Sequence, residues 1–417
     1  MSGLTTSSRS LDEAIARLGR GPLTEESVQQ HIAPLFSRVL ASDRVNERVF
    51  DRLCDRVYLA NHSLGRPLDA MAKDVHEATS LWETKLGDAW EAWLAEQEDF
   101  RARIAQLIHA PRTDCIVPKT SAGQGLRAVL NALPGIPRVL STRGEFDSID
   151  LVLKQYASMG RIEMWWVDAD AEGLYTVPGI VRHLGPEIDL VVISQVMFMN
   201  GQVVHRLDQL ADECHSVGAK LLVDCYHAAA VFSVDVADMR ADFAIGGSYK
   251  YLRGGPGACF LYLSPEILSS ELRPLDTGWF AREDTFGYER PDPPRLRSGG
   301  DAFLESTPAV LTYYQARSGQ QFTLAVTVER LREYGLKQLR QLKQYLSEAG
   351  IDAVGGDADH GAFLSVRHAK ARHLAEKLAE RNVITDARGE WLRLCPDCLT
   401  RDVELRTAAS VLQNSLK

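Results

Sequence analysis

Residues 242–257 read DFAIGGSYKYLRGGPG. The apolar start of this stretch predicts a buried strand, and the turn after it places Lys250 at the strand's carboxyl end. The glycines that follow allow the chain to turn closely beneath a bound molecule. An earlier apolar run, in LLVDCYHAAA, ends at Asp224. A lysine here can form an imine with an aldehyde cofactor, and a carboxylate one strand away can pair with a protonated ring nitrogen.

Outward from this stretch, short apolar runs alternate with helical segments between Thr113 and about Leu263. The predicted strands lie in CIVP, RVLST, IEMWWVD, IDLVVIS, AKLLVD, DFAIGG and ACFLYL, and the helices in GLRAVLNAL, SIDLVLKQYASM and LDQLADECHSVG. Runs rich in Val, Ile and Leu suit strands buried on both faces, and the helices have the length of crossovers. The pattern predicts an α/β fold with a mostly parallel central sheet, in which ligands collect at the carboxyl ends of the strands.

The flanking segments predict the domain organisation. Residues 1–60 form an N-terminal helical segment, with apolar positions at helical spacing in LDEAIARLG and ESVQQHIAPLFSRVLA. Residues 61–290 form the large cofactor-binding α/β domain, which starts with a helical stretch that ends at Pro111. The Pro-, Gly- and Arg-rich run ERPDPPRLRSGGD marks a boundary or an ordered loop near residue 290. Residues 291–417 form a smaller α+β domain.

Composition narrows the class of function. The chain has 417 residues, a net charge of −9, 45% hydrophobic and 25% charged residues, which are the values of an ordinary globular protein. Lys and Arg are clustered nowhere, so nucleic acid is not expected as a partner. No apolar run reaches the ~18 residues of a membrane span, and the N-terminus lacks the apolar core of a signal peptide. We expect a cytoplasmic enzyme acting on small molecules.

The seven cysteines are odd in number and scattered, which indicates reduced thiols. Only Cys395-Pro-Asp-Cys398 has the spacing of a metal or redox pair. A zinc site would need two further ligands, and a redox dithiol usually opens a helix in a much smaller fold. The favoured interpretation is two incidental thiols in a turn, and no metal is expected.

With Asp224 and Lys250 placed at the ends of two strands in this alternation of strands and helices, the chain resembles the fold-type I pyridoxal-phosphate enzymes of the aminotransferase class V group. Within that group the chain resembles the kynureninases from about Tyr58 to Val411. The segments that carry the resemblance are YLANHSLGRP, VDCYHAAA, DFAIGGSYKYLRGGPG, LDTGWF, STPAVL and WLRLCP. The resemblance implies pyridoxal 5'-phosphate as the cofactor, a small-molecule amino-acid substrate and a homodimer with its site near the interface.

The resemblance assigns roles at the cofactor. It implies that Lys250 is the Schiff-base lysine, that Tyr249 contacts the phosphate and assists proton transfer, and that Asp224 pairs with the pyridinium nitrogen. His227 matches a histidine of the cofactor pocket, although a satisfied buried histidine explains it equally well. Phe146 is implied to stack on the pyridine ring of the cofactor. The alternative is that it is an ordinary residue of the hydrophobic core. The phosphate is expected at Ser121, Ala122 and Gly123, which precede a helix and are also compatible with ordinary capping, with Trp279 reaching toward it from the partner subunit.

Further matches concern the substrate. Arg393 matches the arginine that binds the α-carboxylate, against the alternative of a surface salt bridge. Ser306 and Thr307 match residues that face the aryl ring. The loop at Asn61 and His62 is expected to line the substrate pocket, but it departs from the family's Gly-Asn, and the stretch MFMNG differs too. For the upstream aryl contact Trp90 is preferred to Trp93. The remaining candidates are Asn200 near the substrate and Asp147 or Asp150 near the cofactor.

The implied activity is hydrolytic Cβ–Cγ cleavage of L-kynurenine, or a close aryl-keto amino acid, to anthranilate and L-alanine. Two alternatives use the same cofactor: a class V aminotransferase, and a β-lyase or desulfurase, which would need a mobile cysteine nucleophile. A third is a catalytically silent relative, against which Asp224, Lys250 and Arg393 argue together.

Overall fold

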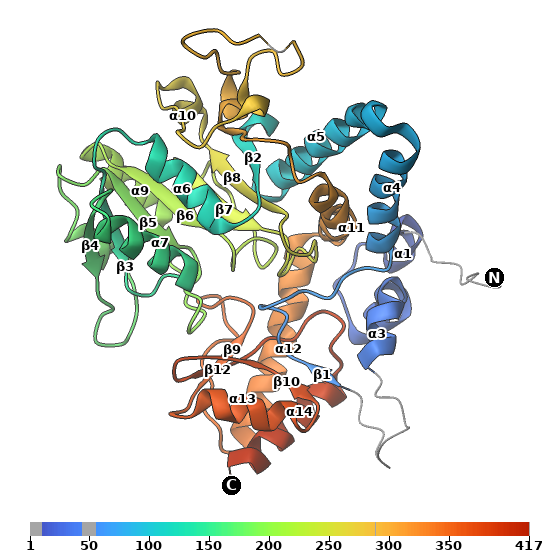
Figure 1. Cartoon of the computed structure of the whole chain (residues 1–417). Coiled ribbons are helices and arrows are strands. Elements are labelled where there is room, and N and C mark those ends of the chain that lie inside the picture. Colours follow the sequence, from blue (N-terminus) through green and yellow to red (C-terminus); the bar gives the residue numbers. More distant parts are fainter. Residues whose placement is uncertain (1–10, 44–55, 288, 417) are drawn as a thin grey trace.

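A seven-stranded sheet lies at the centre of the computed structural model, which describes residues 11–43, 56–287 and 289–416 (Figure 1). Its strand order is β2-β8-β7-β6-β5-β3-β4. The strands are β2 (Ile116–Lys119), β3 (Arg138–Thr142), β4 (Glu163–Val167), β5 (Leu190–Ser194), β6 (Lys220–Asp224), β7 (Phe243–Gly247) and β8 (Cys259–Leu263). Strand β8 is antiparallel to β2 and β7, and the other pairs are parallel. The predicted α/β class with a mostly parallel sheet is confirmed.

Both faces of this sheet are covered, which explains its apolar strands. Every residue of β5, β7 and β8 is buried. Along β5 successive side chains point to opposite faces, so that Val191 and Ile193 join one core and Leu190 and Val192 the other. Helices α5 (Trp90–Leu107) and α9 (Leu207–Ser216) contribute to the first core, and α6 (Ala122–Ala132) and α7 (Asp147–Ser158) to the second.

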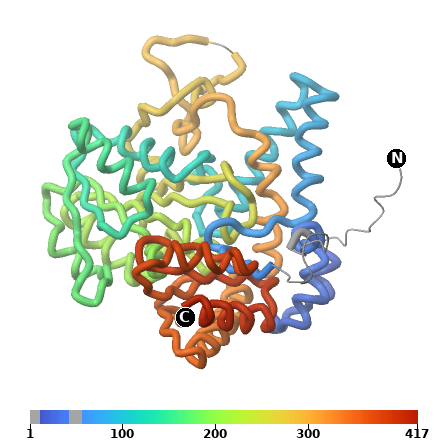
Figure 2. Tube along the Cα trace, turned by 60° about the horizontal axis from the view of Figure 1, so that its bottom comes forward, coloured from blue at the N-terminus to red at the C-terminus, as the bar shows by residue number. Residues whose placement is uncertain are grey.

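The C-terminal part has a three-stranded antiparallel sheet of order β11-β12-β9 and a core of its own. Its elements are α11 (Val310–Val326), α12 (Val328–Glu348), β9 (Leu364–Arg367), α13 (Ala371–Ala379), β10 (Val383–Ile384), β11 (Asp386–Arg388), β12 (Trp391–Leu394) and α14 (Asp402–Leu416). The short strand β1 (Val57–Tyr58) pairs in parallel with β10. Figure 2 shows this red and orange part lying against the green and yellow sheet domain. The domain boundaries near residues 60 and 290 stay a prediction.

Helices dominate the described part of the N-terminal segment, where a small core includes Val28, Ile32 and Phe36. They are α1 (Leu11–Leu18), α2 (Glu25–Ser27), η1 (Val28–Ile32), η2 (Ala33–Phe36) and α3 (Ser37–Asp43). Residues 1–10 and 44–55, with Cys54, lie outside the described residues. The remaining helices are α4 (Ala70–Lys85), η3 (Leu86–Ala89), η4 (Thr113–Cys115), α8 (Val177–Val181), α10 (Pro265–Ser269), η5 (Trp279–Ala281) and η6 (Gly299–Phe303). Among the described helices, none combines the length and apolarity that crossing a membrane requires.

Candidate active site

Asp224 and Lys250 meet at the carboxyl edge of the sheet. Asp224 is the last residue of β6, and Lys250 follows the end of the neighbouring parallel strand β7. Parallel strands end at the same edge, which is why residues 26 positions apart come together. Both side chains are buried, with 4% of Asp224 and 5% of Lys250 exposed.

Burial shifts both groups toward their neutral forms. It lowers the pKa of the Lys250 amine, while the carboxylate of Asp224 opposes part of that shift. Burial also raises the pKa of Asp224, against the hydrogen bond that its Oδ1 accepts from the Tyr226 amide at 2.8 Å. A neutral amine has a free lone pair, so this lysine is suited to attack a carbonyl carbon at neutral pH.

His227 is the direct polar neighbour of Lys250. Its Nε2 lies 2.7 Å from Lys250 Nζ, and its Nδ1 lies 3.2 Å from the Tyr251 hydroxyl. Burial first, and then the charges of Lys250 and Arg393, lower the pKa of His227 well below its ordinary value. The ring is therefore neutral, with one nitrogen donating and the other accepting a hydrogen bond.

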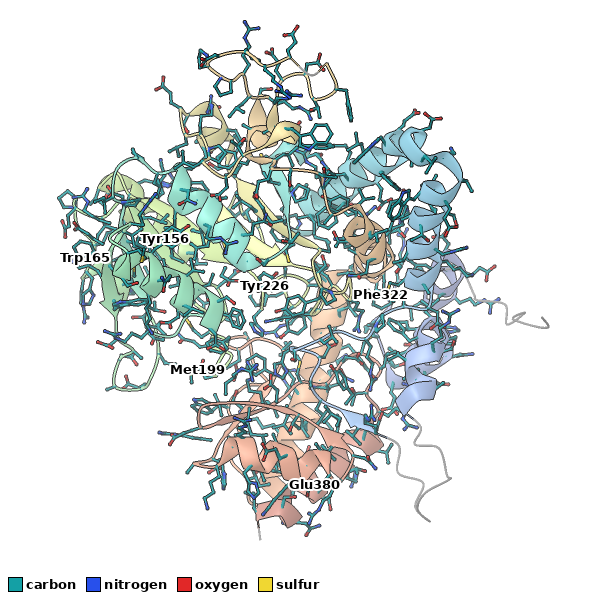
Figure 3. All side chains as sticks on the ribbon, viewed as in Figure 1. Tyr156, Trp165, Met199, Tyr226, Phe322 and Glu380 are labelled. Carbon is teal, nitrogen blue, oxygen red and sulfur yellow. The ribbon has the colours of Figure 1, made fainter. Side chains whose placement is uncertain are left out.

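Three aromatic rings surround the Lys250 amine. Its Nζ lies 5.4 Å from the centroid of Phe146, 5.5 Å from that of Tyr226 and 5.6 Å from that of Tyr249. Phe146 is the residue directly before α7, after the carboxyl end of β3, so its ring reaches the same edge of the sheet. In Figure 3, Tyr226 lies between the central sheet and the C-terminal part of the molecule. The rings give the amine apolar walls against which a flat molecule could stack.

Arg393 comes from the C-terminal sheet and is buried near Lys250, whose pKa its charge helps to lower. One terminal nitrogen donates to the carbonyl oxygen of Phe198, and the other donates to Asp386 Oδ2 at 2.6 Å. Its Nε is buried and has no hydrogen-bond partner among the described residues. A buried guanidinium nitrogen without an acceptor can donate to an anionic or carbonyl ligand.

His62 lies beside this arginine. Its Nε2 is 3.4 Å from Asp386 Oδ2, although neither ring nitrogen makes an aligned hydrogen bond within the described part of the chain. The ring packs on Phe363 with centroids 5.1 Å apart. Burial lowers the pKa of His62 to about 3, so it is neutral at physiological pH. The departure from the family pattern at this position thus places a neutral imidazole, with both ring nitrogens available to a ligand, next to Arg393.

The loop that carries Asn61 and His62 is fixed to the lysine segment. The Gly65 amide donates to the Tyr249 carbonyl oxygen at 2.8 Å, and Asn61 Oδ1 is buried without a hydrogen-bond partner in the described structure. A Cβ at Gly65 would overlap the carbonyl oxygen of Lys250. Only glycine permits this close approach of two backbones.

We expect Gly65→Ala to destabilise the protein by about 2–3 kcal/mol, because the loop must move away from Lys250 to make room for the methyl group. Gly335→Ala is the matched control, since a Cβ there meets nothing within 4 Å and alanine favours the helix. Urea unfolding of the two variants measures the difference. Equal stabilities would show that the contact of Gly65 with Lys250 is dispensable.

A second group of predicted residues lies apart from Lys250, with no described contact to it. Trp279 Nε1 donates to Thr307 Oγ1 at 3.3 Å, and Ser306 and Thr307 line a pocket with Thr120 and Gln124. Trp90 packs on Phe280 with centroids 5.8 Å apart, and on Trp93 at 5.4 Å. The residues around Trp279 form a second cluster, although Trp279 and Trp90 pack on the same core as Phe146 and Tyr249.

The remaining candidates occupy helix starts and turns. Ser121 caps α6, its Oγ accepting from the Gln124 amide at 3.1 Å, and the amides of Ala122 and Gly123 stand in the first turn, where helices have free donors. Asp147 begins α7. The other polar candidates are engaged locally: Asp150 accepts from Lys154 at 2.7 Å, and Asn200 Oδ1 accepts from the Gln202 amide at 3.1 Å.

Glu145 was not predicted from the sequence, although it directly precedes Phe146. It is 3% exposed and accepts hydrogen bonds at 2.6 Å from both Thr142 Oγ1 and Ser194 Oγ. Burial raises its pKa to about 7, and the nearby charge of Asp224 adds to the shift. The signal in the sequence was a carboxylate at a strand end, the same signal that identified Asp224.

We expect Glu145→Gln to stabilise the protein more at pH 8 than at pH 5. The folded pKa of Glu145 is about 7 against an ordinary value of 4.5, so the folded state binds more protons and stability falls as pH rises through this interval. The glutamine variant lacks this loss of stability, which is about 2–3 kcal/mol between pH 5 and pH 8. Urea unfolding of both proteins at the two pH values measures it. A difference independent of pH would contradict a raised pKa.

The chain is similar to known proteins over most of its length. Residues 68–391 match the family model described as aminotransferase class-V. The chain is 28% identical to a kynureninase of Deinococcus radiodurans over 81% of its length and 84% of that protein. It is 26% identical to the uncharacterized aminotransferase YcbU of Bacillus subtilis over 87% of the chain and 95% of that protein. The structure of the cystine C–S lyase C-DES superimposes with a TM-score of 0.76 at 18% identity, covering 87% of this chain and 98% of that one. The resemblance stated from the sequence is confirmed.

Proposed function

Because the chain belongs to the aminotransferase class-V family, we propose that it is a pyridoxal-phosphate-dependent hydrolase that cleaves the Cβ–Cγ bond of L-kynurenine or a close aryl-keto amino acid. Water supplies the oxygen for the new carboxyl group of anthranilate and a proton for the methyl group of L-alanine. The observation that carries the proposal is that Lys250 and the unpaired Nε of Arg393 lie in the same buried site. The similarity to a kynureninase over most of both chains supports the substrate.

The cofactor of the protein is pyridoxal 5'-phosphate, and the residues around Lys250 fit it. Lys250 would hold its aldehyde carbon, Phe146 would lie on its ring, and the start of α6 at Ser121 would receive the phosphate. Asp224 is a buried carboxylate whose charged form burial disfavours, so a protonated ring nitrogen would supply the missing counter-charge. When bound, the cofactor supplies an electron sink for the bonds at the substrate's Cα.

Lys250 and Tyr249 are proposed to move the protons. When its amine is free, Lys250 takes the proton from the substrate's Cα, which its lowered pKa favours at neutral pH. Burial raises the pKa of Tyr249 to about 12, so its hydroxyl keeps its proton and can donate it to a developing anion.

Arg393 is proposed to hold the substrate's α-carboxylate. Its buried Nε lacks an acceptor, and the neutral ring of His62 next to it can add a hydrogen bond. Because Asp386 already engages one terminal nitrogen, the carboxylate would bind beside an existing ion pair and not to a free guanidinium. This anchoring orients the Cα–H bond toward Lys250.

The aryl end of the substrate is proposed to meet residues of a second subunit. Ser306, Thr307, Trp279 and Trp90 belong to the cluster away from Lys250 of their own chain, and in a homodimer this cluster would face the site of the partner. Each site would then combine a cofactor-binding half from one chain with an aryl-binding half from the other.

The test of this function is the product pair. Purified protein given L-kynurenine should release anthranilate, followed by its fluorescence, and L-alanine in equal amounts. L-3-Hydroxykynurenine, and L-alanine with a 2-oxo acid, serve as comparison substrates. Transfer of the amino group without anthranilate would reject the hydrolase and favour an aminotransferase, the alternative that the similarity to YcbU supports.

The β-lyase or desulfurase alternative has less support. The six cysteines in the described part of the chain are all buried, and burial raises the pKa of each thiol. A buried, protonated thiol is a poor nucleophile. Release of sulfide from L-cysteine or L-cystine is the assay for this activity.

A further inference from the structure

A line of buried polar groups runs from Lys250 to the carbonyl oxygen of Ala362. Lys250 Nζ lies 2.7 Å from His227 Nε2, and His227 Nδ1 lies 3.2 Å from the Tyr251 hydroxyl. The Tyr251 hydroxyl hydrogen-bonds in turn to the sulfur of Cys395. Cys395 Sγ finally lies 3.0 Å from the carbonyl oxygen of Ala362. The first four residues are each 7% exposed or less.

The carbonyl at the end of this line fixes the role of the Cys395 thiol. A carbonyl oxygen only accepts, so the thiol of Cys395 donates to Ala362. The contact with Cys395 raises the pKa of Tyr251 and lowers that of the thiol, as expected when the Tyr251 hydroxyl donates to the sulfur. The hydroxyl oxygen is then left to accept from Nδ1–H of His227. The second carbonyl near the thiol, that of Pro396 at 3.6 Å, imposes the same direction. His227 Nε2 is therefore a bare acceptor facing Lys250.

We propose that Tyr251 and Cys395 are positioning residues that hold His227 as its Nδ1–H tautomer and so keep the Lys250 lone pair free. In this tautomer the amine donates an N–H to Nε2, and its lone pair points elsewhere. In the opposite tautomer Nε2–H would donate to the amine and occupy the lone pair that bonds to the cofactor and takes a proton. The inference rests on Lys250 being the functional amine of the proposed function.

The ionisable groups around His227 keep its ring neutral. Besides burial, Lys250, Arg393, His62 and Arg388 each lower its pKa. His227 therefore stays neutral, and the hydrogen bond at Nδ1 alone decides which nitrogen carries the proton. Burial raises the pKa of Cys395 to about 12 and that of Tyr251 well above its ordinary value, so both keep the proton that they donate.

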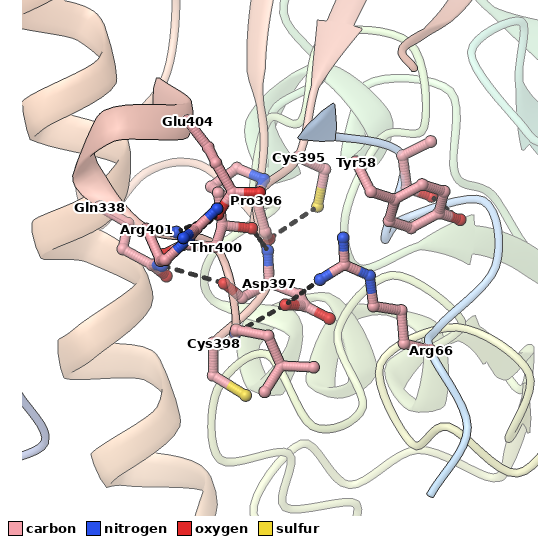
Figure 4. Close-up of polar contacts among 12 residues, drawn as sticks. Tyr58, Arg66, Gln338, Cys395, Pro396, Asp397, Cys398, Thr400, Arg401 and Glu404 are labelled. Atoms are coloured by element: carbon pink, nitrogen blue, oxygen red, sulfur yellow. Dashed lines mark hydrogen bonds and ion pairs between the residues drawn. The ribbon is translucent and has the colours of Figure 1, made fainter. Parts of the chain in front are cut away.

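The segment after Cys395 holds the thiol in place (Figure 4). Asp397 is fully buried, accepts from Arg253 at 3.0 Å and lies 3.7 Å from Arg66. Gln338 Nε2 donates to the carbonyl oxygens of Asp397, at 2.9 Å, and of the residue three positions on, at 2.8 Å. Cys398 accepts from Arg253 at 3.4 Å and is a free thiol, as is Cys395. The Cys-Pro-Asp-Cys turn thus gives its two thiols different partners.

Nitrogen NMR of full-length protein labelled with ¹⁵N-histidine tests the proposal, because ring nitrogen shifts distinguish the tautomers. The protein has eleven histidines, and the signals that disappear in His227→Gln identify those of His227. We expect the Nδ1–H tautomer in the unsubstituted protein, with cofactor bound and after its removal. The Nε2–H tautomer would overturn the proposal, even if every variant below failed to fold.

Substitutions provide a second readout, the rate at which cofactor-depleted protein regains its colour with pyridoxal phosphate. Tyr251→Phe and Cys395→Ala should mix the tautomers and slow this rate about fivefold to tenfold, the effect of one buried hydrogen bond. Cys395→Ser keeps a donor and acceptor and should restore both readouts, while Cys214→Ala, a buried thiol on α9, should change neither. An unchanged tautomer in Cys395→Ala would also overturn the proposal. These readouts do not depend on kynurenine, so they separate this inference from the proposed substrate.

Discussion

Lys250→Ala should abolish turnover, lowering kcat by roughly 10⁴-fold or more, since it removes both the group that binds the cofactor covalently and the base that moves the Cα proton. The fold should tolerate the change. Burial disfavours the ammonium form of this lysine, so its removal eliminates a buried ionisable group that is unfavourable to the folded state. We expect an unchanged or slightly higher melting temperature, together with a loss of the yellow colour that survives washing.

Lys220→Ala is the matched control for this experiment. Lys220 begins the strand that Asp224 ends, is about one-third exposed, and lies at the opposite edge of the sheet. Its replacement should leave activity within about twofold. Activity in Lys250→Ala comparable to that of the control would remove Lys250 from the site altogether.

Arg393→Gln should lower kcat/KM by about 10²-fold or more, mainly through KM. Truncating one partner of a buried, hydrogen-bonded charge pair costs about 2–5 kcal/mol, and here the lost partner is the substrate's carboxylate. Burial alone would raise the pKa of Asp386, but His62 and Arg393 hold it below its ordinary value. The variant therefore also leaves Asp386 with less positive charge, so its stability should be measured beside its kinetics.

Arg388→Gln separates the two roles of Arg393, which are binding the substrate's carboxylate and supporting Asp386. Arg388 donates to Asp386 Oδ1 at 2.7 Å, as Arg393 donates to Oδ2, but its side chain is 41% exposed. If Arg393 acts on the substrate, only its own substitution should raise KM strongly, and addition of guanidinium should restore part of the activity. Equal effects of the two substitutions would assign both arginines to the support of Asp386.

The pattern of short apolar runs in the sequence was enough to predict the central sheet and the residues at its carboxyl edge. The seven predicted strands all form, because most of their apolar residues are buried in the two cores on either side of the sheet, although β4 at its edge is only partly buried. Asp224 and Lys250 were identified because each follows such a run, and the parallel pairing of β6 with β7 brings them together. Phe146 and His227 lie beside Lys250 for the same reason.

Contacts between distant segments could not be predicted in this way. Asp386 was missed because its significance depends on the antiparallel pairing of β11 with β12, which sets it opposite Arg393. Tyr251 and Cys395 meet only because the C-terminal part of the chain folds back on the sheet domain. The spacing of Cys395 and Cys398 is that of a metal-binding or redox pair of thiols. In the structure the turn between them serves to bury Asp397 between Arg253 and Arg66.

Reduction with borohydride, followed by protease digestion and mass spectrometry, tests most directly whether Lys250 carries the cofactor. The account predicts that the reduced cofactor is found on the peptide containing Lys250. Lys119 is the other buried lysine of the described chain, held by Glu305 at 2.7 Å. The cofactor on Lys119, or on any lysine but Lys250, would contradict the account.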